Sequence, residues 1–201
     1  MKLYFSPFSP YVRKCLVTAH EVGLADRISL LPSAVHPVQR DAVVMASNPL
    51  SKVPTLITDD GQALYDSRVI CEYINHLGGG QLFPAAGPAR WRALTLQSLA
   101  DGMLDAALLV RYEGNARPEA LRWAEWTNGQ MDKISTAMAA LEASSDMRHQ
   151  NADIGTLSLG CTLWYLDLRF ADLGWRARFP QLAAWAAEFG QRASSKAVWS
   201  L

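Results

Sequence analysis

Ser9 places a hydroxyl group at the expected start of a helix, a position that suits the activation of a thiol. Ser9 is a favourable N-cap residue, Pro10 fits the first helical position, and Gly23 suits the helix end. Unpaired N–H groups and the positive end of the helix dipole favour a negative charge at such a start. A free thiol has a pKa of about 8.5, whereas cysteines in such sites have values of roughly 3.5–7.5, so a thiol bound there is more often the nucleophilic thiolate. An ordinary helix cap is the alternative interpretation.

A second helix start, at Asp66-Ser67, has the features of an anion site. The Ser67 hydroxyl and the N–H groups of the first turn suit a carboxylate, while the Asp66 side chain suits an ammonium group. Between the two helices, Lys52, Val53 and Pro54 lead into an apolar strand. A plain helix cap and a plain strand entry are the alternatives for these two segments.

The elements that must position these segments follow from turn residues and apolar periodicity. Strands are expected at 2–6, 27–31, 55–58 and 63–65, and helices at 10–22, 36–46 and 67–77, the second of them weak. Apolar side chains repeat at helical spacing in the first and last of these helices, which gives each one buried face. The order β-α-β-α-β-β-α, a helical crossover followed by a hairpin, predicts an α/β layer of the thioredoxin type.

The second part of the chain is predicted to be entirely helical. All seven tryptophans lie after residue 90, and the glycines and prolines between 78 and 88 mark a helix stop and a linker. Helices are expected at 89–112, 118–143, 153–172 and 180–192, with Asp153 as the cap of the third and Thr156 in its first turn. The predicted organisation is an α/β domain at 1–78, a linker at 79–88 and an all-α domain at 89–201.

Composition limits the classes of function. The 201 residues contain 19 Lys+Arg and 19 Asp+Glu, so no overall charge attracts the protein to nucleic acid or to an anionic membrane. Three widely spaced cysteines, Cys15, Cys71 and Cys161, form no metal-ligand pattern and suit a reducing compartment. No apolar run has the length of a signal core or a membrane span. We expect a cytoplasmic protein that uses no metal and binds neither nucleic acid nor membrane.

The first segment also resembles a known active site. Ser9-Pro10-Tyr11-Val12 lies where a glutaredoxin carries its redox-active C-P-Y-C, but both cysteines are absent. The longer segment S-P-Y-V-R-K-C-L resembles the active-site turn of bacterial, cytosolic, serine-type glutathione S-transferases. This resemblance implies that the Ser9 hydroxyl hydrogen-bonds to the sulfur of glutathione, with Ser6 as the second choice. Pro10 stands where a bacterial subgroup has a catalytic cysteine, which argues against that chemistry here.

Residues 48–56, N-P-L-S-K-V-P-T-L, are similar to the N-P-x-G-K-V-P-x-L motif of the same family, with Ser51 in place of the glycine. In the family the proline of this motif follows a cis peptide bond, which here would be the bond before Pro54. The resemblance implies that the main chain of Val53 binds the cysteinyl part of glutathione. It also implies that Lys52 binds the glycine carboxylate.

Asp66-Ser67 and the residues that follow resemble the family motif E/D-S-x-x-I-x-x-Y-[IL]. The resemblance implies that Ser67 and the helix N–H groups bind the γ-glutamyl carboxylate and that Asp66 pairs with the ammonium group. D-I-G-T at 153–156 resembles the helix-capping segment of the family, and its expected role is in folding.

The helical part is expected to supply a pocket for an apolar electrophile. The residues expected to line the pocket are Phe8, Tyr11, Met103, Tyr112 and Trp164. For the last three, packing in the bundle core is the alternative. Asp101, on the first helix of this part, either reaches the glutathione of a partner subunit or is a solvated carboxylate. The family resemblance implies a homodimer.

The sequence leaves three functions open. The first is conjugation of glutathione to an electrophile. The second is glutathione-dependent thiol–disulfide exchange or dehydroascorbate reduction, which normally needs a cysteine at the helix start, whereas Cys15 lies about two turns inside the helix on its buried face. The third is a non-catalytic module that keeps the glutathione site.

Overall fold

The computed structural model describes residues 1–144 and 152–201. These residues form two compact units: an N-terminal unit, Met1–Ala85 with Ala193–Leu201, and a helical unit, Ala86–Arg192. The N-terminal unit has the thioredoxin-like layer that the sequence predicts, and the helical unit contains helices and no strand among its described residues. The predicted fold class is therefore confirmed.

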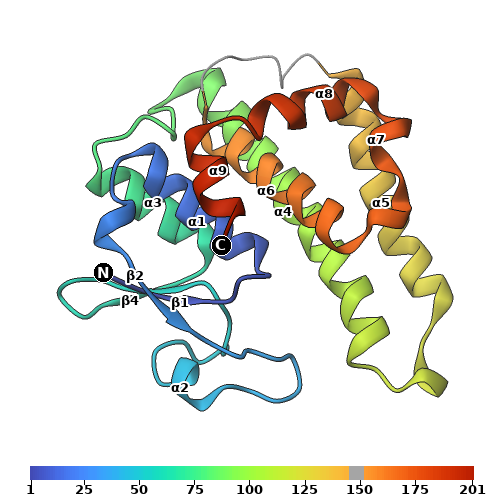
Figure 1. Ribbon diagram of the computed structural model, residues 1–201, viewed down its shortest axis with the longest axis horizontal. Helices are drawn as coiled ribbons and strands as arrows, with labels where there is room; N and C mark the ends of the chain where they lie inside the picture. The colour runs from blue at the N-terminus through green and yellow to red at the C-terminus, as the bar shows by residue number, and fades with distance from the viewer. Residues whose placement is uncertain (145–151) are drawn as a thin grey trace. The chain divides into compact units, whose positions relative to one another are not determined.

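The sheet of the N-terminal unit is mixed, with strand order β2-β1-β3-β4 (Figure 1). Its strands are β1 (Lys2–Phe5), β2 (Ser29–Pro32), β3 (Thr55–Ile57) and β4 (Ala63–Leu64). Strand β1 runs parallel to β2 and antiparallel to β3, and β3 runs antiparallel to β4. Leu3 of β1 lies opposite Leu56 of β3, and both side chains are fully buried, so this pair anchors the centre of the sheet.

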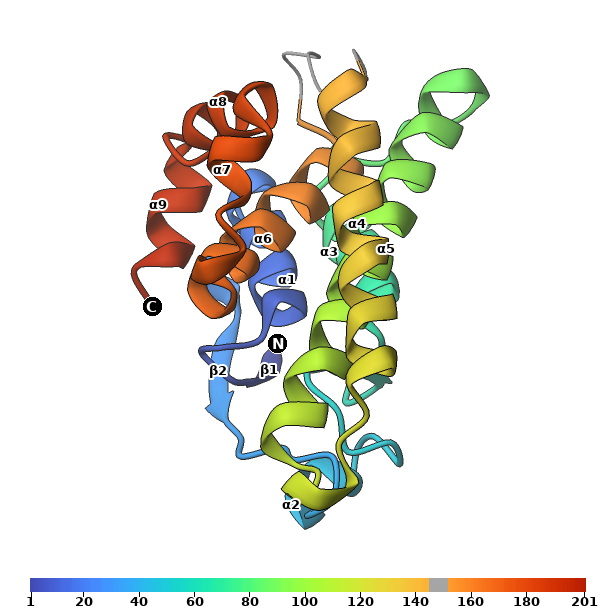
Figure 2. The ribbon, with the colours of Figure 1, turned by 90° about the vertical axis from the view of Figure 1, so that its right-hand side faces the viewer.

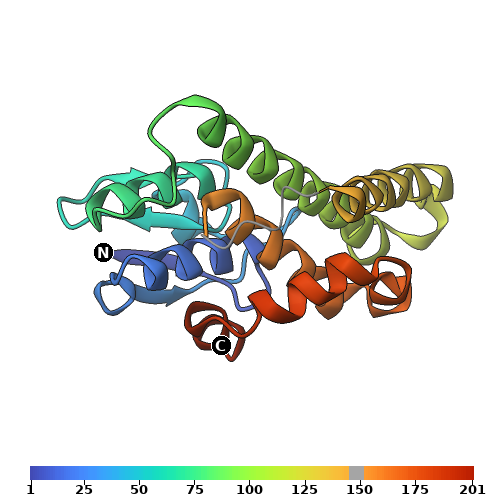
Figure 3. The same cartoon turned by 90° about the horizontal axis from the view of Figure 1, so that it is seen from above.

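Helices cover this sheet (Figures 1 and 3). Those over the sheet are α1 (Pro10–Glu21) and α3 (Ser67–Leu77), and the unit also contains α2 (Ala42–Met45), α9 (Ala193–Trp199) and a short 3₁₀ turn η1 (Ala25–Arg27). Helix α1 packs against α3, and the side chains of Val12, Cys15, Ile70 and Ile74 in this layer are fully buried. Helix α9 also packs against α1.

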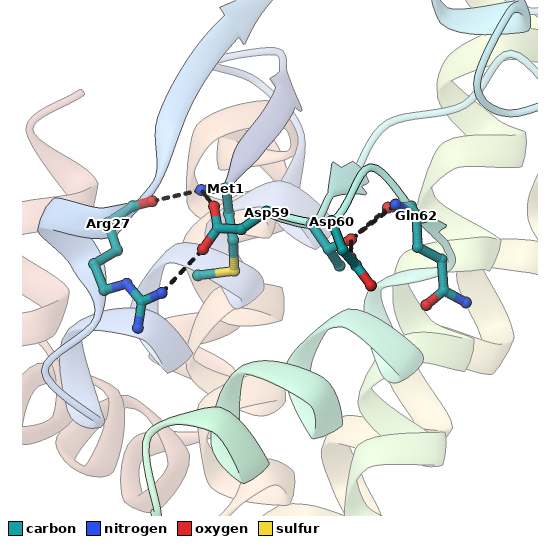
Figure 4. Close-up of polar contacts among 6 residues, drawn as sticks. Met1, Arg27, Asp59, Asp60 and Gln62 are labelled. Atoms are coloured by element: carbon teal, nitrogen blue, oxygen red, sulfur yellow. Dashed lines mark hydrogen bonds and ion pairs between the residues drawn. The ribbon is translucent and has the colours of Figure 1, made fainter.

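The hairpin between β3 and β4 ties down the start of the chain (Figure 4). The amino group of Met1 donates to the Asp59 carboxylate at 2.6 Å and to the main-chain oxygen of Arg27 at 3.0 Å. Arg27 donates to the same carboxylate at 2.9 Å. Hydrogen bonds from these two cations hold the pKa of Asp59 below its usual range. Because the Arg27 and Asp59 side chains are exposed, the contribution of their ion pair to stability is small.

The helical unit is built around two long helices that run side by side, α4 and α5 (Figure 2). Its helices are α4 (Gly87–Asn115), α5 (Ala124–Ala143), α6 (Ile154–Arg169), α7 (Trp175–Arg178) and α8 (Pro180–Phe189), with 3₁₀ turns η2 (Glu119–Leu121) and η4 (Ala171–Leu173). Helix α6 lies at the centre, and it approaches its neighbours closely. A Cβ at Gly160 would lie 2.1 Å from the Phe189 ring, and one at Gly155 would lie 2.6 Å from the main-chain oxygen of Ala93.

By length and composition alone, α4 is apolar enough to cross a membrane, and it is the one such helix among the described residues. Half of its most apolar stretch is buried inside the protein. Core helices of soluble proteins have the same properties, so this feature carries little weight.

Element boundaries differ from the sequence predictions in a few places. The predicted weak helix at 36–46 shortens to α2, and η1 occupies the start of the predicted strand at 27–31. Short helices α7 and α9 were not predicted, because helices of four and seven residues contain too few turns to show periodicity. Residues 193–201, which the sequence assigns to the helical domain, cluster with the N-terminal unit, while the boundary after Ala85 falls within the expected linker.

Candidate functional site

A four-residue turn, Ser6–Ser9, connects β1 to α1 and carries both predicted serines. The turn is closed by a hydrogen bond of 3.1 Å from the Ser9 N–H to the Ser6 carbonyl. Ser9 is the N-cap of α1, and its hydroxyl oxygen accepts the Val12 N–H at 3.3 Å. The Ser9 side chain is half-buried. Because the oxygen is the acceptor in this bond, the hydroxyl hydrogen can be donated to a ligand at the helix start.

The segment before β3 has the geometry that the family motif implies. The Val53–Pro54 peptide bond is cis, as expected. Thr55, the first residue of β3, lies opposite Tyr4 of β1, so Pro54 and the end of β1 are at the same edge of the sheet. The Lys52 side chain is exposed, and that of Val53 is half-buried. This edge therefore brings Lys52 and Val53 close to the Ser6–Ser9 turn.

A small polar network, which the sequence did not reveal, supports this segment. The Asn48 amide donates to the Thr55 hydroxyl at 2.9 Å and to the Lys52 carbonyl at 3.3 Å, and Thr55 donates to the same carbonyl at 2.8 Å. Asn48 and Thr55 are 1% and 0% exposed. Buried polar groups that are paired in this way fix the local main chain.

Ser51 stands where the family motif has glycine, and the structure gives a reason for that glycine. The φ angle of Ser51 is +52°, in the left-handed region that favours glycine. Its hydroxyl accepts the Asp41 N–H at 3.0 Å and donates to the Asp41 carbonyl at 3.2 Å. These bonds connect the residue that caps α2 to the segment that leads to Lys52.

Asp66 and Ser67 start α3, as the sequence predicts. The Asp66 carboxylate is exposed and accepts the Arg68 N–H at 2.9 Å, while Ser67 is 3% exposed. The Tyr65–Asp66 peptide bond is cis. Helix α3 packs against α1, so the N-terminal unit contains two neighbouring helices that each start at polar residues. The same unit contains the Lys52–Pro54 segment. This combination suits a ligand with several charges and a thiol.

Cys15 does not lie at the helix start. It is fully buried in α1, with its sulfur 3.9 Å from the sulfur of Cys71 and 4.0 Å from the Ser67 carbonyl oxygen. A nucleophilic cysteine must be accessible to its substrate, and these contacts place the Cys15 thiol in the packed layer between α1 and α3.

The predicted pocket residues are divided between the two units. In the N-terminal unit Phe8 is 55% exposed and Tyr11 is half-buried. In the helical unit Met103 is 2% exposed, Trp164 is half-buried and Tyr112 is 38% exposed. The exposure of Met103 agrees with the alternative that it packs in the bundle core.

Arg111 and Tyr165 lie near enough to Tyr112 to interact with it electrostatically. Burial raises the pKa of Tyr112 and of Tyr165, and nearby Arg111 opposes the rise for both. Burial, and then repulsion from Arg111, lowers the pKa of Arg169. These groups come from α4 and α6, so this part of the helical unit is more polar than the expected apolar pocket.

Two other expectations for the helical unit can be checked. Asp101 is 1% exposed, so it is not a solvated carboxylate; it lies one turn from buried Gln97 on the inner face of α4. Asp153 caps α6 in a reciprocal capping box with Thr156, as the resemblance implies. Among the described residues no group of three or more His, Cys, Asp or Glu side chains is arranged to hold a metal ion.

Comparisons with known proteins point in one direction. Residues 8–77 match the family model described as glutathione S-transferase, N-terminal domain. The chain is 32% identical over 187 residues, 90% of each protein, to the "Uncharacterized GST-like protein YibF" of Escherichia coli (strain K12). It is similar to a glutathione transferase family member from Pseudomonas fluorescens Pf-5 with bound glutathione, at 48% identity and a TM-score of 0.93, covering 98% of this chain and 97% of that one.

Two further solved structures also contain glutathione or a derivative of it. One, again from Pseudomonas fluorescens Pf-5, holds S-(propanoic acid)-glutathione; it is 46% identical, with a TM-score of 0.90 and coverage of 98% of both chains. The other, a glutathione S-transferase from Methylobacillus flagellatus KT with bound glutathione, is 34% identical, with a TM-score of 0.86 and coverage of 98% of both chains.

Proposed function

Because the chain belongs to the glutathione S-transferase family, we propose that it is a glutathione transferase that activates the thiol of glutathione with the Ser9 hydroxyl. The observation that carries this proposal is the geometry of the Ser9 cap. The Ser9 oxygen accepts the Val12 N–H, which leaves the hydroxyl hydrogen for the sulfur at the start of α1. Hydrogen bonding to the charged form and the field of the helix both lower a thiol pKa.

Glutathione is anchored by the two neighbouring segments. Ser67 and the first N–H groups of α3 bind the γ-glutamyl carboxylate, and Asp66 pairs with the ammonium group. The main chain of Val53 pairs with the cysteinyl part, and the exposed Lys52 side chain binds the glycine carboxylate. Relatives that share 34–48% of their residues with this chain have bound glutathione in their structures, which supports this assignment.

The reaction is a nucleophilic attack by sulfur. The thiol gives its proton to solvent, and the Ser9 O–H donates to the resulting thiolate. The thiolate forms a sulfur–carbon bond with the electrophile, and the electron pair of the broken bond moves to a leaving group or to the acceptor group of an activated double bond. We propose that the residues that contact an apolar electrophile include Phe8 and Tyr11, near Ser9 in the sequence, and Tyr112 and Trp164, whereas Met103 is 2% exposed and packs in the bundle core. The S-(propanoic acid)-glutathione bound by a relative supports space for a group on the sulfur.

Further parts of the proposal rest on family membership. We propose that the protein is a cytoplasmic homodimer that acts in detoxification, without a metal and without binding nucleic acid or membrane. In the proposed organisation residues 1–78 bind glutathione, 79–88 are a linker, and the helical part from residue 89 to Arg192 supplies electrophile-binding residues and dimer contacts, because residues 193–201 belong to the N-terminal unit.

Conjugation of a chromogenic aryl halide tests the proposed function. Purified protein with glutathione is expected to form the conjugate, and calorimetry is expected to detect glutathione binding by the same sample. Reduction of a mixed disulfide or dehydroascorbate that is lost in Cys15→Ser would instead favour a reductase, which the burial of Cys15 argues against. Glutathione binding without turnover of several electrophiles would favour a binding module.

A further inference from the structure

Arg13 is a charged residue inside the N-terminal unit, and its function is not explained by the glutathione motifs. It lies in α1, one turn after Ser9, and its main-chain N–H donates to the Ser9 carbonyl at 3.1 Å. The residue is only 3% exposed. A guanidinium remains charged at any physiological pH, so its burial requires strong hydrogen bonds.

The Arg13 guanidinium forms a bridge between two stretches of main chain that are far apart in the sequence. Its Nε and one terminal nitrogen donate to the Pro7 carbonyl at 3.1 and 2.7 Å. That terminal nitrogen also donates to the main-chain oxygen of Leu201 at 2.9 Å, and the other terminal nitrogen donates to the Val198 carbonyl. Hydrogen bonds from a charged donor are stronger than those between neutral groups.

Pro7 lies in the middle of the turn that carries both serines. Its carbonyl belongs to the central peptide of the Ser6–Ser9 turn, the peptide whose rotation changes one type of β-turn into another. Two donors from one planar group hold this carbonyl in place. Phe8 and Ser9 follow this peptide directly, so the hydrogen bonds from Arg13 act on the turn that leads into the Ser9 cap.

The other side of the bridge depends on α9. Val198 is fully buried, and at the opposite end of the helix Ser194 donates to the Glu21 carboxylate. Ser194 therefore lies beside the end of α1, while Val198 lies beside Arg13 near its start, so α9 runs antiparallel to α1. If α9 moved away, two acceptors of the buried guanidinium would be lost.

We propose that Arg13 is a positioning residue for Ser9, and that the segment Ala193–Leu201 holds Arg13 in the orientation that fixes the Ser6–Ser9 turn. This inference deepens the proposed function and rests on it. The chain's last helix would then control the acidity of the bound thiol without touching glutathione.

The test is the substitution Arg13→Lys, which keeps the positive charge but removes the planar group that reaches both main-chain stretches. The thiolate of bound glutathione is titrated by its ultraviolet absorbance, and conjugation is measured across pH. We expect the apparent thiol pKa to rise and kcat to fall about 10-fold near pH 6.5, with the KM for glutathione changed less than about twofold, because a misplaced catalytic group costs rate more than binding. Arg27→Lys, the same change at an exposed ion pair of the same unit, is the control and should leave both values unchanged.

A milder variant, Val198→Ala, weakens the packing of α9 and keeps Arg13. This variant should raise the thiol pKa by a smaller amount than Arg13→Lys does, and amide hydrogen exchange in residues 193–201 should become faster. If Arg13→Lys does not fold, Val198→Ala tests the proposal in its place. Lower thermal stability with an unchanged pH profile in both variants would overturn the proposal. If Ser9→Ala in the otherwise native chain leaves the pKa of the bound thiol unchanged, the proposed role of Ser9 fails. If Ser9→Ala raises this pKa and the Arg13 and Val198 variants do not raise it, only the inference about Arg13 fails.

Discussion

Helices α1 and α6 both start at a polar cap, but the two caps use their hydrogen-bonding groups differently. At α6, the Asp153 carboxylate accepts the Thr156 N–H and the Thr156 hydroxyl accepts the Asp153 N–H, both at 2.9 Å. At α1, the Ser9 hydroxyl accepts one N–H at 3.3 Å, and its hydrogen remains for a ligand. We call the start of α6 closed, because its two capping residues bond to each other, and the start of α1 open, because the Ser9 hydroxyl hydrogen remains for a ligand.

The start of α3 is of the open type too. The Asp66 carboxylate accepts the Arg68 N–H, and the buried Ser67 hydroxyl follows it directly. Open starts lie in the N-terminal unit and the reciprocal box in the helical unit. If this difference reflects function, substitutions at open starts should change catalysis or binding, and those at the closed start should change stability.

Ser9→Ala should give the largest effect. Loss of the hydrogen bond to the thiolate, worth about 1.5–3 kcal/mol for a charged partner, should lower kcat/KM by about 10- to 150-fold and raise the pKa of the bound thiol. Glutathione affinity, measured by calorimetry near neutral pH, should change much less. Ser6→Ala is the matched control on the same turn, and a larger loss in Ser6→Ala would make Ser6 the catalytic serine.

Ser67→Ala should weaken binding more than catalysis. One hydrogen bond to a carboxylate is lost, so the KM for glutathione should rise by roughly 10-fold while kcat at saturation stays within about twofold. Steady-state kinetics with varied glutathione measure both values. An equal fall in kcat and kcat/KM would mean instead that Ser67 acts in the transition state.

Asp153→Ala should affect stability alone. Removing an N-cap of this kind costs about 0.5–2 kcal/mol, because the Thr156 N–H loses its acceptor while the bond from the main-chain N–H of residue 153 to the Thr156 hydroxyl is kept. Denaturant unfolding measures this value, and the thiol pKa and KM of the folded protein should equal those of the native chain. A changed thiol pKa in Asp153→Ala would remove the distinction between open and closed caps.

Sequence reasoning identified the open and closed caps because capping follows local rules. Ser9, Asp66 and Asp153 are N-caps in the structure, and the N-terminal unit contains strands and helices in the predicted order β-α-β-α-β-β-α. The fold class and the cis bond before Pro54 were also predicted correctly. Contacts between distant parts of the chain were not, because no local pattern encodes them.

Two residues illustrate that limit. The sequence assigned no contact to Arg13, whose acceptors in the structure include the main-chain oxygens of Val198 and Leu201. Asp101 was expected at a surface and is buried, since burial on α4 depends on which helices surround it. The proposed binding site for the electrophile stays a prediction, because its shape depends on which way side chains such as Tyr112 face.

The smallest expected effect concerns Glu113, near the C-terminal end of α4. Its carboxylate accepts hydrogen bonds from the Trp123 N–H at 2.9 Å and from the Arg117 side chain at 2.7 Å. The hydrogen bond from the Trp123 main chain, then the one from Arg117, holds the pKa of Glu113 below its usual range. A depressed folded-state pKa stabilises the protein above the unfolded-state value, and this stability is lost as pH falls through the folded-state pKa. Glu113→Gln should therefore lower the melting temperature slightly at pH 7, and this difference should disappear in acid below that pKa. Turnover at pH 7 should not change, because the Glu113 carboxylate, like that of Asp153, accepts hydrogen bonds from other groups of the protein. A loss of turnover in the folded Glu113→Gln variant would show that a carboxylate paired in this way also acts in catalysis.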